Sequence, residues 1–160
     1  MDRYIENNKV HWNEITPVHE RSDMYDVAGF KAGRCALKPA ELREIGNDVA
    51  GKTMLHLQCH FGLDTLSWAR RGAIVTGVDF SDKAVTLARQ LSEETAIPAD
   101  FIYSDIHSLT TVLDKQFDIV FTSYGVLCWL PDLGKWAEII NHFLKPGGFF
   151  YIVEGHPVMN

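Results

Sequence analysis

Acidic residues at the ends of apolar runs are the strongest chemical signal in the sequence. Asp79 ends the run at 73–78, and Asp105 follows the run at 101–103. An ionised carboxylate only accepts hydrogen bonds, so Asp79 suits the vicinal hydroxyls of a ribose and repels a phosphate. Asp105 could accept from the amino group of an adenine, with Ile106 packed on the ring. The alternative for both carboxylates is an acidic turn residue without a ligand.

The loop at residues 58–62, QCHFG, lies between two predicted elements. It holds one glycine, Gly62, whereas a dinucleotide-binding loop uses three and a phosphate-binding loop adds a lysine. Asp79 follows Gly62 by 17 residues, near the spacing of a nucleoside-binding βαβ unit. The pattern therefore favours a nucleoside without phosphates.

Two other chemistries fit the sequence less well. His56, Cys59 and His60 are close together, but no fourth ligand follows with paired spacing, so we expect no metal site. Cys59 lacks an identifiable general base, and a small buried cysteine is the simpler interpretation. His19 and His156 could each act as a base near a substrate, or could be surface or capping residues.

Apolar runs alternate with helical patterns along most of the chain. The strands and helices that they predict must hold the candidate site residues in place. We expect strands over 53–57, 73–78, 101–103, 117–122 and 149–153. We expect helices over 39–45 and 63–71, a third helix that begins after the cap Ser81, and a fourth that begins after Pro131 and Asp132. The alternation predicts a doubly wound α/β fold with a mainly parallel sheet. Ligands of such sheets bind at the carboxyl ends of the strands, where the loops after the strands meet.

The first 38 residues differ from the rest. They carry aromatic and histidine side chains in a charged background without a sustained period, so we expect short helices and loops that pack on the domain at 39–160. The segment Trp129–Leu130–Pro131 and Trp136 could form a partner surface. Helical spacing favours the core for these side chains.

Composition and charge narrow the class of protein. The 160 residues suit one domain, and a net charge of −6 with a pI near 5.6 argues against nucleic acid or an anionic membrane as partner. The longest stretch without a charged side chain, 119–131, has 13 residues and is too short to span a bilayer. Three cysteines without a close pair and an N-terminus without a signal-peptide core make a cytoplasmic location our expectation.

Five segments together resemble a known family. They are, in order, MLHLQCHFG, VTGVDFS, FIYSDI, FDIVFTSYGVL and LKPGGFFYIVE. The set resembles the class I methyltransferases that use S-adenosyl-L-methionine, and the resemblance extends from about Pro39 to the end. It implies a Rossmann-like sheet that usually has seven strands, of which five are recognisable here. We therefore expect a C-terminally incomplete sheet with an N-terminal helical lid, and an open edge at strand 149–153 that a second copy could cover as a homodimer.

The resemblance also implies a cofactor site. Residues 58–62 would pass beside the methionine part, Asp79 would hold the ribose, Phe80 would flank the adenine, and Ser123 and Tyr124 would lie near the sulfonium and the substrate. Trp12 and Tyr25 would line the site from the lid. The implied cofactor-binding positions are His56, Gln58, Cys59, His60, Phe61, Gly62, Asp79, Phe80, Asp105, Ile106, Ser123 and Tyr124.

The match departs from the family at three of these positions. His56 stands where the family has an acid on the first strand, and Gln58 and His60 replace two glycines. Backbone carbonyls and Gln58 could still accept from the methionine ammonium group. The expected function is methyl transfer from S-adenosyl-L-methionine to a small molecule by in-line displacement, leaving S-adenosyl-L-homocysteine. Tyr124, His19 and His156 are the catalytic candidates.

Two other functions stay open. One is a degenerate module that holds the nucleoside without catalysis, which the altered loop at 58–62 would allow. The other is a nicotinamide-dependent oxidoreductase, which the missing glycine fingerprint disfavours.

Overall fold

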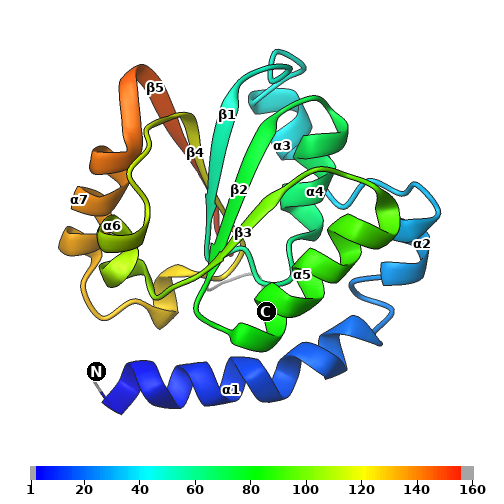
Figure 1. Cartoon of the computed structure of the whole chain (residues 1–160), viewed down its shortest axis with the longest axis horizontal. Coiled ribbons are helices and arrows are strands. Elements are labelled where there is room, and N and C mark those ends of the chain that lie inside the picture. The colour runs from blue at the N-terminus through cyan, green and yellow to red at the C-terminus, as the bar shows by residue number, and fades with distance from the viewer. Residues whose placement is uncertain (1–2, 156–160) are drawn as a thin grey trace.

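A single parallel sheet organises the molecule, seen here in a computed structural model that describes residues 3–155 (Figure 1). Its five strands lie in the order β3-β2-β1-β4-β5, and every neighbouring pair is parallel. The strands are β1 (Thr53–Leu57), β2 (Ile74–Asp79), β3 (Asp100–Tyr103), β4 (Phe117–Ser123) and β5 (Leu144–Val153). The order reverses beside β1, so the predicted doubly wound α/β fold is confirmed.

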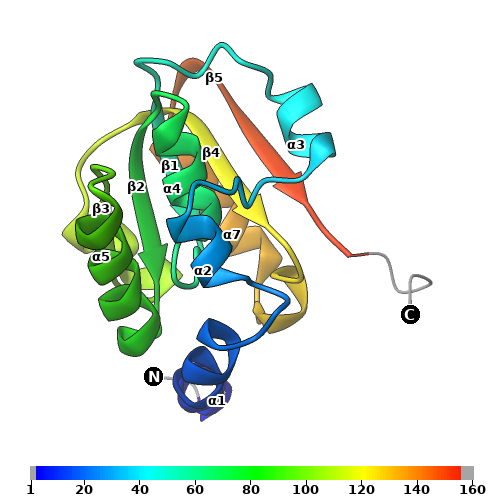
Figure 2. The same ribbon diagram turned by 90° about the vertical axis from the view of Figure 1, so that its right-hand side faces the viewer.

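Helices cover both faces of the sheet (Figure 1). On one face α4 and α5 pack against β2 and β3, and on the other α7 packs against β4 and β5. Figure 2 shows α3 on the α4 side, beyond β4. The helices are α1 (Arg3–Glu20), α2 (Val27–Lys31), α3 (Pro39–Glu44), α4 (Leu63–Arg70), α5 (Asp82–Thr95), α6 (Leu109–Val112) and α7 (Leu133–Phe143), with single 3-10 turns η1 (Ile106–Ser108) and η2 (Leu127–Trp129).

Local sequence signals account for the two longest domain helices. Ser81 caps α5 by accepting a hydrogen bond from the backbone N–H of Ala84 at 3.1 Å. The apolar side chains of α5 point to the core at the expected spacing. Asp132 caps α7 in the same way, and Trp136 is buried in the core, as its spacing predicts. Leu133, three residues before Trp136, shares its helical spacing but is exposed.

The strand β5 begins five residues earlier than predicted, at Leu144. Leu144 pairs with Phe117, whereas Phe149 pairs with Ile119, so the residues between them form a bulge. A Cβ on Gly148 would lie 2.8 Å from the carbonyl oxygen of Asp118, which explains why the chain needs glycine there. In the described part of the chain, β5 is an edge strand, and its cover by a second copy stays a prediction.

The N-terminal segment contradicts the expectation of short helices. Residues 3–20 form one 18-residue helix, α1, which contains Pro17. Its sequence lacks a clean period because α1 buries little: Thr16 alone among residues 3–20 is buried, and the others are exposed or partly exposed. Contacts with α5 and with the loops after the strands hold it across the carboxyl ends of the sheet (Figure 1). The following α2 is short, as expected, and buries Phe30 completely.

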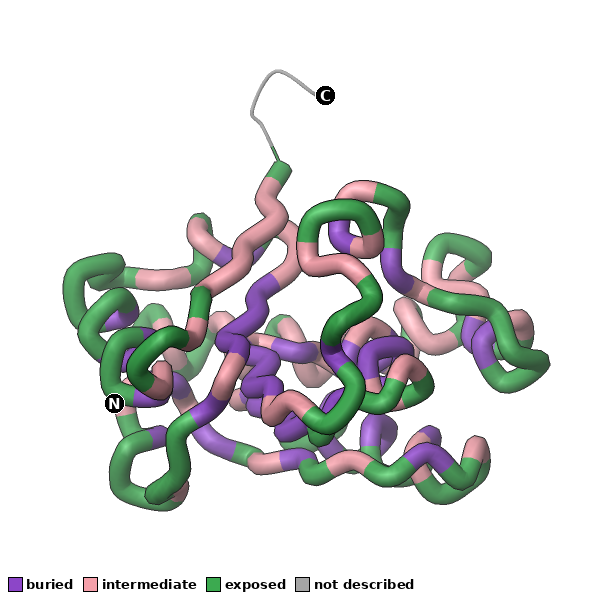
Figure 3. Tube along the Cα trace, turned by 90° about the horizontal axis from the view of Figure 1, so that it is seen from above, coloured by how far each residue is buried: buried purple, intermediate pink, exposed green. Residues whose placement is uncertain are grey.

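Burial is greatest in the inner strands. Figure 3 shows buried residues gathered in the centre of the molecule and exposed residues on its outer turns. β1 and β2 are buried on both faces, as expected of parallel strands between two helical layers. No helix within residues 3–155 has the length and apolar character needed to cross a membrane.

Candidate functional site

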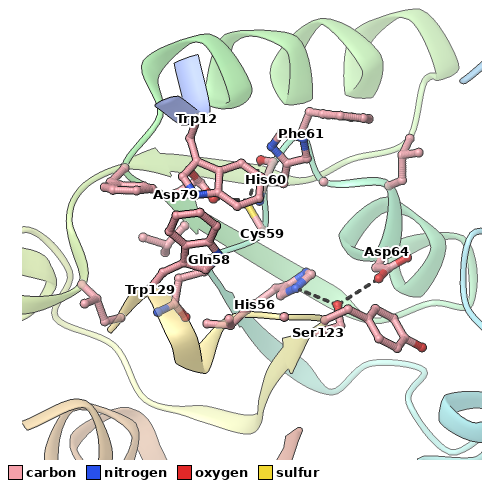
Figure 4. Close-up of a pocket in the computed structure, with 18 of the residues that line it drawn as sticks. Trp12, His56, Gln58, Cys59, His60, Phe61, Asp64, Asp79, Ser123 and Trp129 are labelled. Atoms are coloured by element: carbon pink, nitrogen blue, oxygen red, sulfur yellow. Dashed lines mark hydrogen bonds between the residues drawn. The ribbon is translucent and has the colours of Figure 1, made fainter. Parts of the chain in front are cut away.

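One cavity of about 300 Å³ lies at the carboxyl ends of the strands, beneath α1 (Figure 4). Its volume is within the range of small-molecule sites. Side chains from the loops after β1, β2, β3 and β4 line it, together with residues of the N-terminal segment. The structure brings all twelve predicted cofactor-binding positions into its lining: His56, Gln58, Cys59, His60, Phe61, Gly62, Asp79, Phe80, Asp105, Ile106, Ser123 and Tyr124.

Asp79 is the last residue of β2 and is only 7% exposed. Its Oδ2 accepts a hydrogen bond from the backbone N–H of His60 at 2.8 Å, and its Oδ1 accepts one from Ser81 at 2.8 Å. Burial raises the pKa of this carboxyl to about 6, against the effect of these donors. Each carboxylate oxygen has a second lone pair, so both oxygens can accept one more hydrogen bond.

Asp105 makes the contacts of a turn residue. Its Oδ1 accepts from the backbone N–H of His107 at 2.8 Å and of Ser108 at 3.2 Å, and its Oδ2 accepts from the hydroxyl of Ser108 at 2.6 Å. It therefore caps η1. Asp105 and Ile106 line the cavity as well, and their role toward an adenine stays a prediction.

The loop after β1 adopts a glycine-like conformation at two residues that are not glycine. Gln58 and His60 both have φ of +52°, in the left-handed region, which costs about 1 kcal/mol for each. Gly62 also has positive φ, and a Cβ there would lie 2.6 Å from the ring of Phe101. Both polar atoms of the Gln58 amide are buried without a hydrogen-bond partner in residues 3–155. Such an amide at a cavity wall indicates a polar ligand.

The remaining side chains of this loop and strand are neutral. Cys59 is buried, and desolvation raises the pKa of its thiol, so it stays protonated at neutral pH. His56 is 2% exposed, and burial lowers its pKa to about 3. Within residues 3–155, no group of three or more histidine, cysteine, aspartate or glutamate side chains is placed to hold a metal ion.

A hydrogen-bonded chain of side chains crosses the floor of the cavity and ends at Asp64 (Figure 4). Thr65 Oγ1 lies 2.8 Å from His56 Nδ1, and His56 Nε2 lies 3.4 Å from Ser123 Oγ. Ser123 then donates to Asp64 Oδ2 at 2.9 Å. Asp64 was not singled out from the sequence, because an acidic residue in the first turn of a helix is an ordinary feature of helices.

An aromatic wall closes the side of the cavity under α1. The ring of Trp12 on α1 lies 5.2 Å from that of His60 and 5.4 Å from that of Trp129, measured between centroids. His19 is not part of the cavity lining, but its Nδ1 lies 3.1 Å from His60 Nε2. Tyr25 packs over both histidines. Burial lowers the pKa of His19, and it lowers that of His60 to about 3.

The other two catalytic candidates have different outcomes. Tyr124 lines the cavity, with Lys38 Nζ 3.8 Å from the centre of its ring. Burial and the nearby Glu41 raise the pKa of its phenol, so Tyr124 stays protonated and can donate a hydrogen bond rather than take a proton. His156 lies outside the described residues.

Polar contacts fix the loops around the cavity. Asn13 on α1 donates from Nδ2 to Asp82 at 2.7 Å and accepts at Oδ1 from the hydroxyl of Ser81 at 2.6 Å. Glu154, after β5, accepts hydrogen bonds from the backbone N–H groups of Gly125, of Val126 at 2.9 Å and of Leu127 at 3.0 Å. Asn13 and Glu154 were not singled out from the sequence, because their partners are far away along the chain.

Comparison with known proteins agrees with the resemblance. Residues 55–152 match the family model described as a methyltransferase domain. The chain is 30% identical over 128 residues to the ubiquinone biosynthesis O-methyltransferase of Coxiella burnetii, covering 79% of this chain and 54% of that protein. The chain thus spans about half the length of the curated relatives it matches.

Solved structures show the same fold. The DhpI complex with S-adenosylhomocysteine superposes with a TM-score of 0.71 at 22% identity, over 96% of this chain and 70% of that one. The Thermus thermophilus 16S rRNA methyltransferase RsmC, solved with S-adenosylmethionine and guanosine, has a TM-score of 0.59 at 26% identity, over 76% of this chain and 35% of that one. The expected exclusion of nucleic acid therefore gains no support from these comparisons.

The family model covers more than half of the chain, from the third residue of β1 to the next-to-last of β5. Its match and the parallel sheet confirm what the five sequence segments implied. The chain belongs to the methyltransferase-domain family, among the class I S-adenosyl-L-methionine-dependent methyltransferases.

Proposed function

We propose that this chain binds S-adenosyl-L-methionine in the cavity under α1 and transfers its methyl group to a small-molecule acceptor. The observation that carries the proposal is the convergence of twelve predicted positions, from the carboxyl ends of four strands and the segments that follow them, on one cavity. When bound, the cofactor supplies an electrophilic methyl group on a sulfonium and leaves as S-adenosylhomocysteine. The protein then contributes alignment and a dry site.

Asp79 is the proposed ribose ligand. Its two oxygens already accept one backbone hydrogen bond each, which fixes the carboxylate and leaves one lone pair on each oxygen. Two acceptors on a rigid group suit two vicinal hydroxyls. Phe80 would flank the adenine, and Asp105 with Ile106 would contact its edge, because all three line the cavity next to Asp79 in the strand order.

The centre of the cavity suits a sulfonium that must lose its charge during transfer. Strong anionic contacts to the sulfur would oppose that loss. His56, Gln58 and Cys59 are neutral at neutral pH, the first because its pKa is about 3 and the last because its pKa is raised. The unpartnered amide of Gln58 can bind a polar group of the cofactor.

The aromatic wall is the proposed acceptor side, and the segment before Pro39 is the proposed lid. Trp12 and Trp129 present apolar ring surface, which favours a small, flat or apolar acceptor (Figure 4). The O-methyltransferase name of the Coxiella relative favours an acceptor oxygen. A hydroxyl proton could pass to His60 Nδ1, which is buried without a partner in the described residues, while His60 Nε2 passes its proton to His19.

Thermal unfolding with added nucleoside tests the proposal. We expect S-adenosylhomocysteine to raise the melting temperature and NAD to leave it unchanged. Asp79→Ala should abolish the shift, whereas Asp100→Ala, at an exposed carboxylate on β3, should keep it. Equal protection of the Asp79→Ala variant would remove the ribose assignment.

A second measurement separates catalysis from binding alone. Labelled S-adenosylmethionine should transfer its methyl group to members of a panel of phenols. Binding of S-adenosylhomocysteine without transfer to any hydroxyl, amine or thiol acceptor would instead favour the degenerate binding module.

A further inference from the structure

The resemblance to the class I methyltransferases implies an acid on the first strand of the sheet, and this chain has no acid on β1. His56 takes that position, and it is buried and neutral. The ammonium group of a bound methionine moiety therefore lacks its usual counter-charge on β1. A buried ammonium needs a carboxylate or several acceptors, because desolvating an unpaired charge is costly.

Asp64 offers a carboxylate at the same end of the cavity. It is the second residue of α4, and it lines the cavity next to Ser123, which follows the neighbouring strand β4 (Figure 4). Asp79 lies on the other side of His56 and Cys59 in the same view (Figure 4). The two acids thus stand at opposite ends of one cavity, with neutral groups between them.

The contacts of Asp64 hold its carboxylate in place but satisfy only part of its capacity to accept hydrogen bonds. Ser123 donates to Oδ2, and this is the one hydrogen bond that Asp64 receives within residues 3–155. The hydroxyl of Ser123 can in turn accept from His56 Nε2–H, which requires Nδ1 of His56 to accept from Thr65. Neutral His56 is the form that supports this directed chain, which explains why a buried histidine is compatible with this site.

The groups around Asp64 do not fully offset the burial of its carboxylate, so a cationic ligand can still stabilise its charge. Burial raises its pKa, while Lys38 and Arg34 lower it. An ammonium group next to Oδ1 would offset the desolvation of the carboxylate. Lys38 and Arg34 also line the cavity, so the carboxylate of the same amino acid moiety would meet positive charge nearby.

We propose that Asp64 binds the α-ammonium group of the methionine moiety of the cofactor, in place of the acid missing at position 56. Ser123 and His56 are positioning residues that hold the Asp64 carboxylate toward the cavity. The inference rests on the proposed function, because it concerns the amino acid end of the same cofactor.

Paired ligands test it by calorimetry on the full chain. S-adenosylhomocysteine carries the ammonium group, its deamino analogue lacks only that group, and 5′-methylthioadenosine lacks the whole amino acid end. Asp64→Asn should weaken S-adenosylhomocysteine at least about tenfold, since a charged hydrogen bond is lost, and should change the other two less than about twofold. Asp114→Asn, at an exposed acid, is the matched control and should change none of the three.

The outcomes are distinguishable. Equal weakening of all three ligands by Asp64→Asn would mean that Asp64 only supports the site's structure, and it would overturn the inference. Unchanged affinity for S-adenosylhomocysteine would overturn it as well. If the wild-type chain binds neither S-adenosylhomocysteine nor 5′-methylthioadenosine, the proposed function itself fails.

A double-mutant cycle tests the positioning role of Ser123. Ser123→Ala should weaken S-adenosylhomocysteine about threefold or more and leave 5′-methylthioadenosine unchanged. In an Asp64→Asn background the same substitution should have no further effect, because its action passes through the carboxylate. Additive losses would contradict this assignment.

Discussion

The two ends of the sheet carry carboxylates in opposite surroundings. At the amino ends, Asp118 on β4 accepts from the backbone N–H and the hydroxyl of Thr53, at 2.8 and 2.7 Å, and from Lys145 at 2.9 Å. These donors lower its pKa. At the carboxyl ends, burial raises the pKa of both Asp79 and Asp64. The first carboxylate is paired with protein groups, and the other two retain capacity for a ligand.

This difference separates a structural acid, Asp118, from the two acids that we propose to bind the ligand. A group whose charged form is fully satisfied by the protein contributes to folding, whereas a buried acid with spare acceptor capacity raises the energy of the free protein and can recover it from a ligand. The same sheet therefore provides an internal control for each proposal about the site.

The largest expected effect contrasts Asp79 with Asp118. Asp79→Asn removes a charged acceptor from the proposed ribose site, so we expect about a hundredfold loss of S-adenosylhomocysteine affinity in calorimetry. Asp118→Asn should leave that affinity unchanged. Similar losses in the two variants would mean that the ends of the sheet do not differ as described.

The second largest expected effect is a loss of stability in acid, caused by His56 near the carboxyl ends of the strands. The pKa of His56 is about 3 in the folded state against 6.5 for the free side chain, so the unfolded chain binds the proton first as pH falls. Stability should therefore fall between pH 6.5 and 3, with about 2 kcal/mol lost at pH 5 from this residue.

The variant His56→Gln isolates that contribution. The slope of the free energy of unfolding against pH measures how many more protons the unfolded state binds than the folded state. We expect this number to be smaller by up to one proton in the variant than in the wild type, whatever the absolute stability of the variant. An unchanged slope between pH 6.5 and 5 would show that His56 titrates normally in the folded protein.

Acid should weaken the contribution of Asp118 at the amino ends as well, but only at lower pH. Asp118→Asn should cost roughly 1 kcal/mol of stability at neutral pH, because Thr53 and Lys145 lose a charged acceptor at a partly exposed site. Since the folded pKa is lowered, this contribution is present above the unfolded pKa of 3.8 and is lost as pH falls below it. Urea unfolding at pH 7 and pH 3 measures it, and an equal difference at both pH values would contradict the ionic origin.

The smallest effect concerns α1 in the proposed lid. Asn13→Ala removes two hydrogen bonds between α1 and the start of α5, so we expect about a threefold to tenfold faster dissociation of S-adenosylhomocysteine. Glu14→Ala, at the adjacent exposed residue, is the control. If both variants release the ligand at the wild-type rate in stopped flow, α1 does not retain it.

Much of the fold could be predicted because its signals are local. Apolar runs gave the five strands, and Ser81 and Asp132 marked helix starts within the sequence itself. α1 was missed as one helix because its contacts, not its own pattern, stabilise it: Trp12 packs on His60 and Trp129, which lie far along the chain.

The sequence placed the candidate residues at one edge of the sheet, where the structure has a cavity, but it did not show the contacts between their side chains. Strand-end positions are fixed by topology, so Asp79 and the loop after β1 were found together. Asp64 was missed because its importance comes from its neighbours Ser123 and His56, a relation that exists only after β1 and β4 pair. The left-handed conformation of Gln58 was also invisible, since the sequence there shows no glycine.

Ser81 takes part in three separate contacts. Its backbone N–H bonds to Asp79, its hydroxyl oxygen accepts from Ala84, and its hydroxyl hydrogen bonds to Asn13 on α1. A shift of this one residue would disturb both Asp79, the proposed ribose ligand, and the hydrogen bond that attaches α1 to the domain. If the proposed nucleoside site at Asp79 and the packing of α1 are coupled through Ser81, thermodynamic reciprocity requires that nucleoside binding stabilise the packing of α1 by the same free energy by which packed α1 strengthens nucleoside binding.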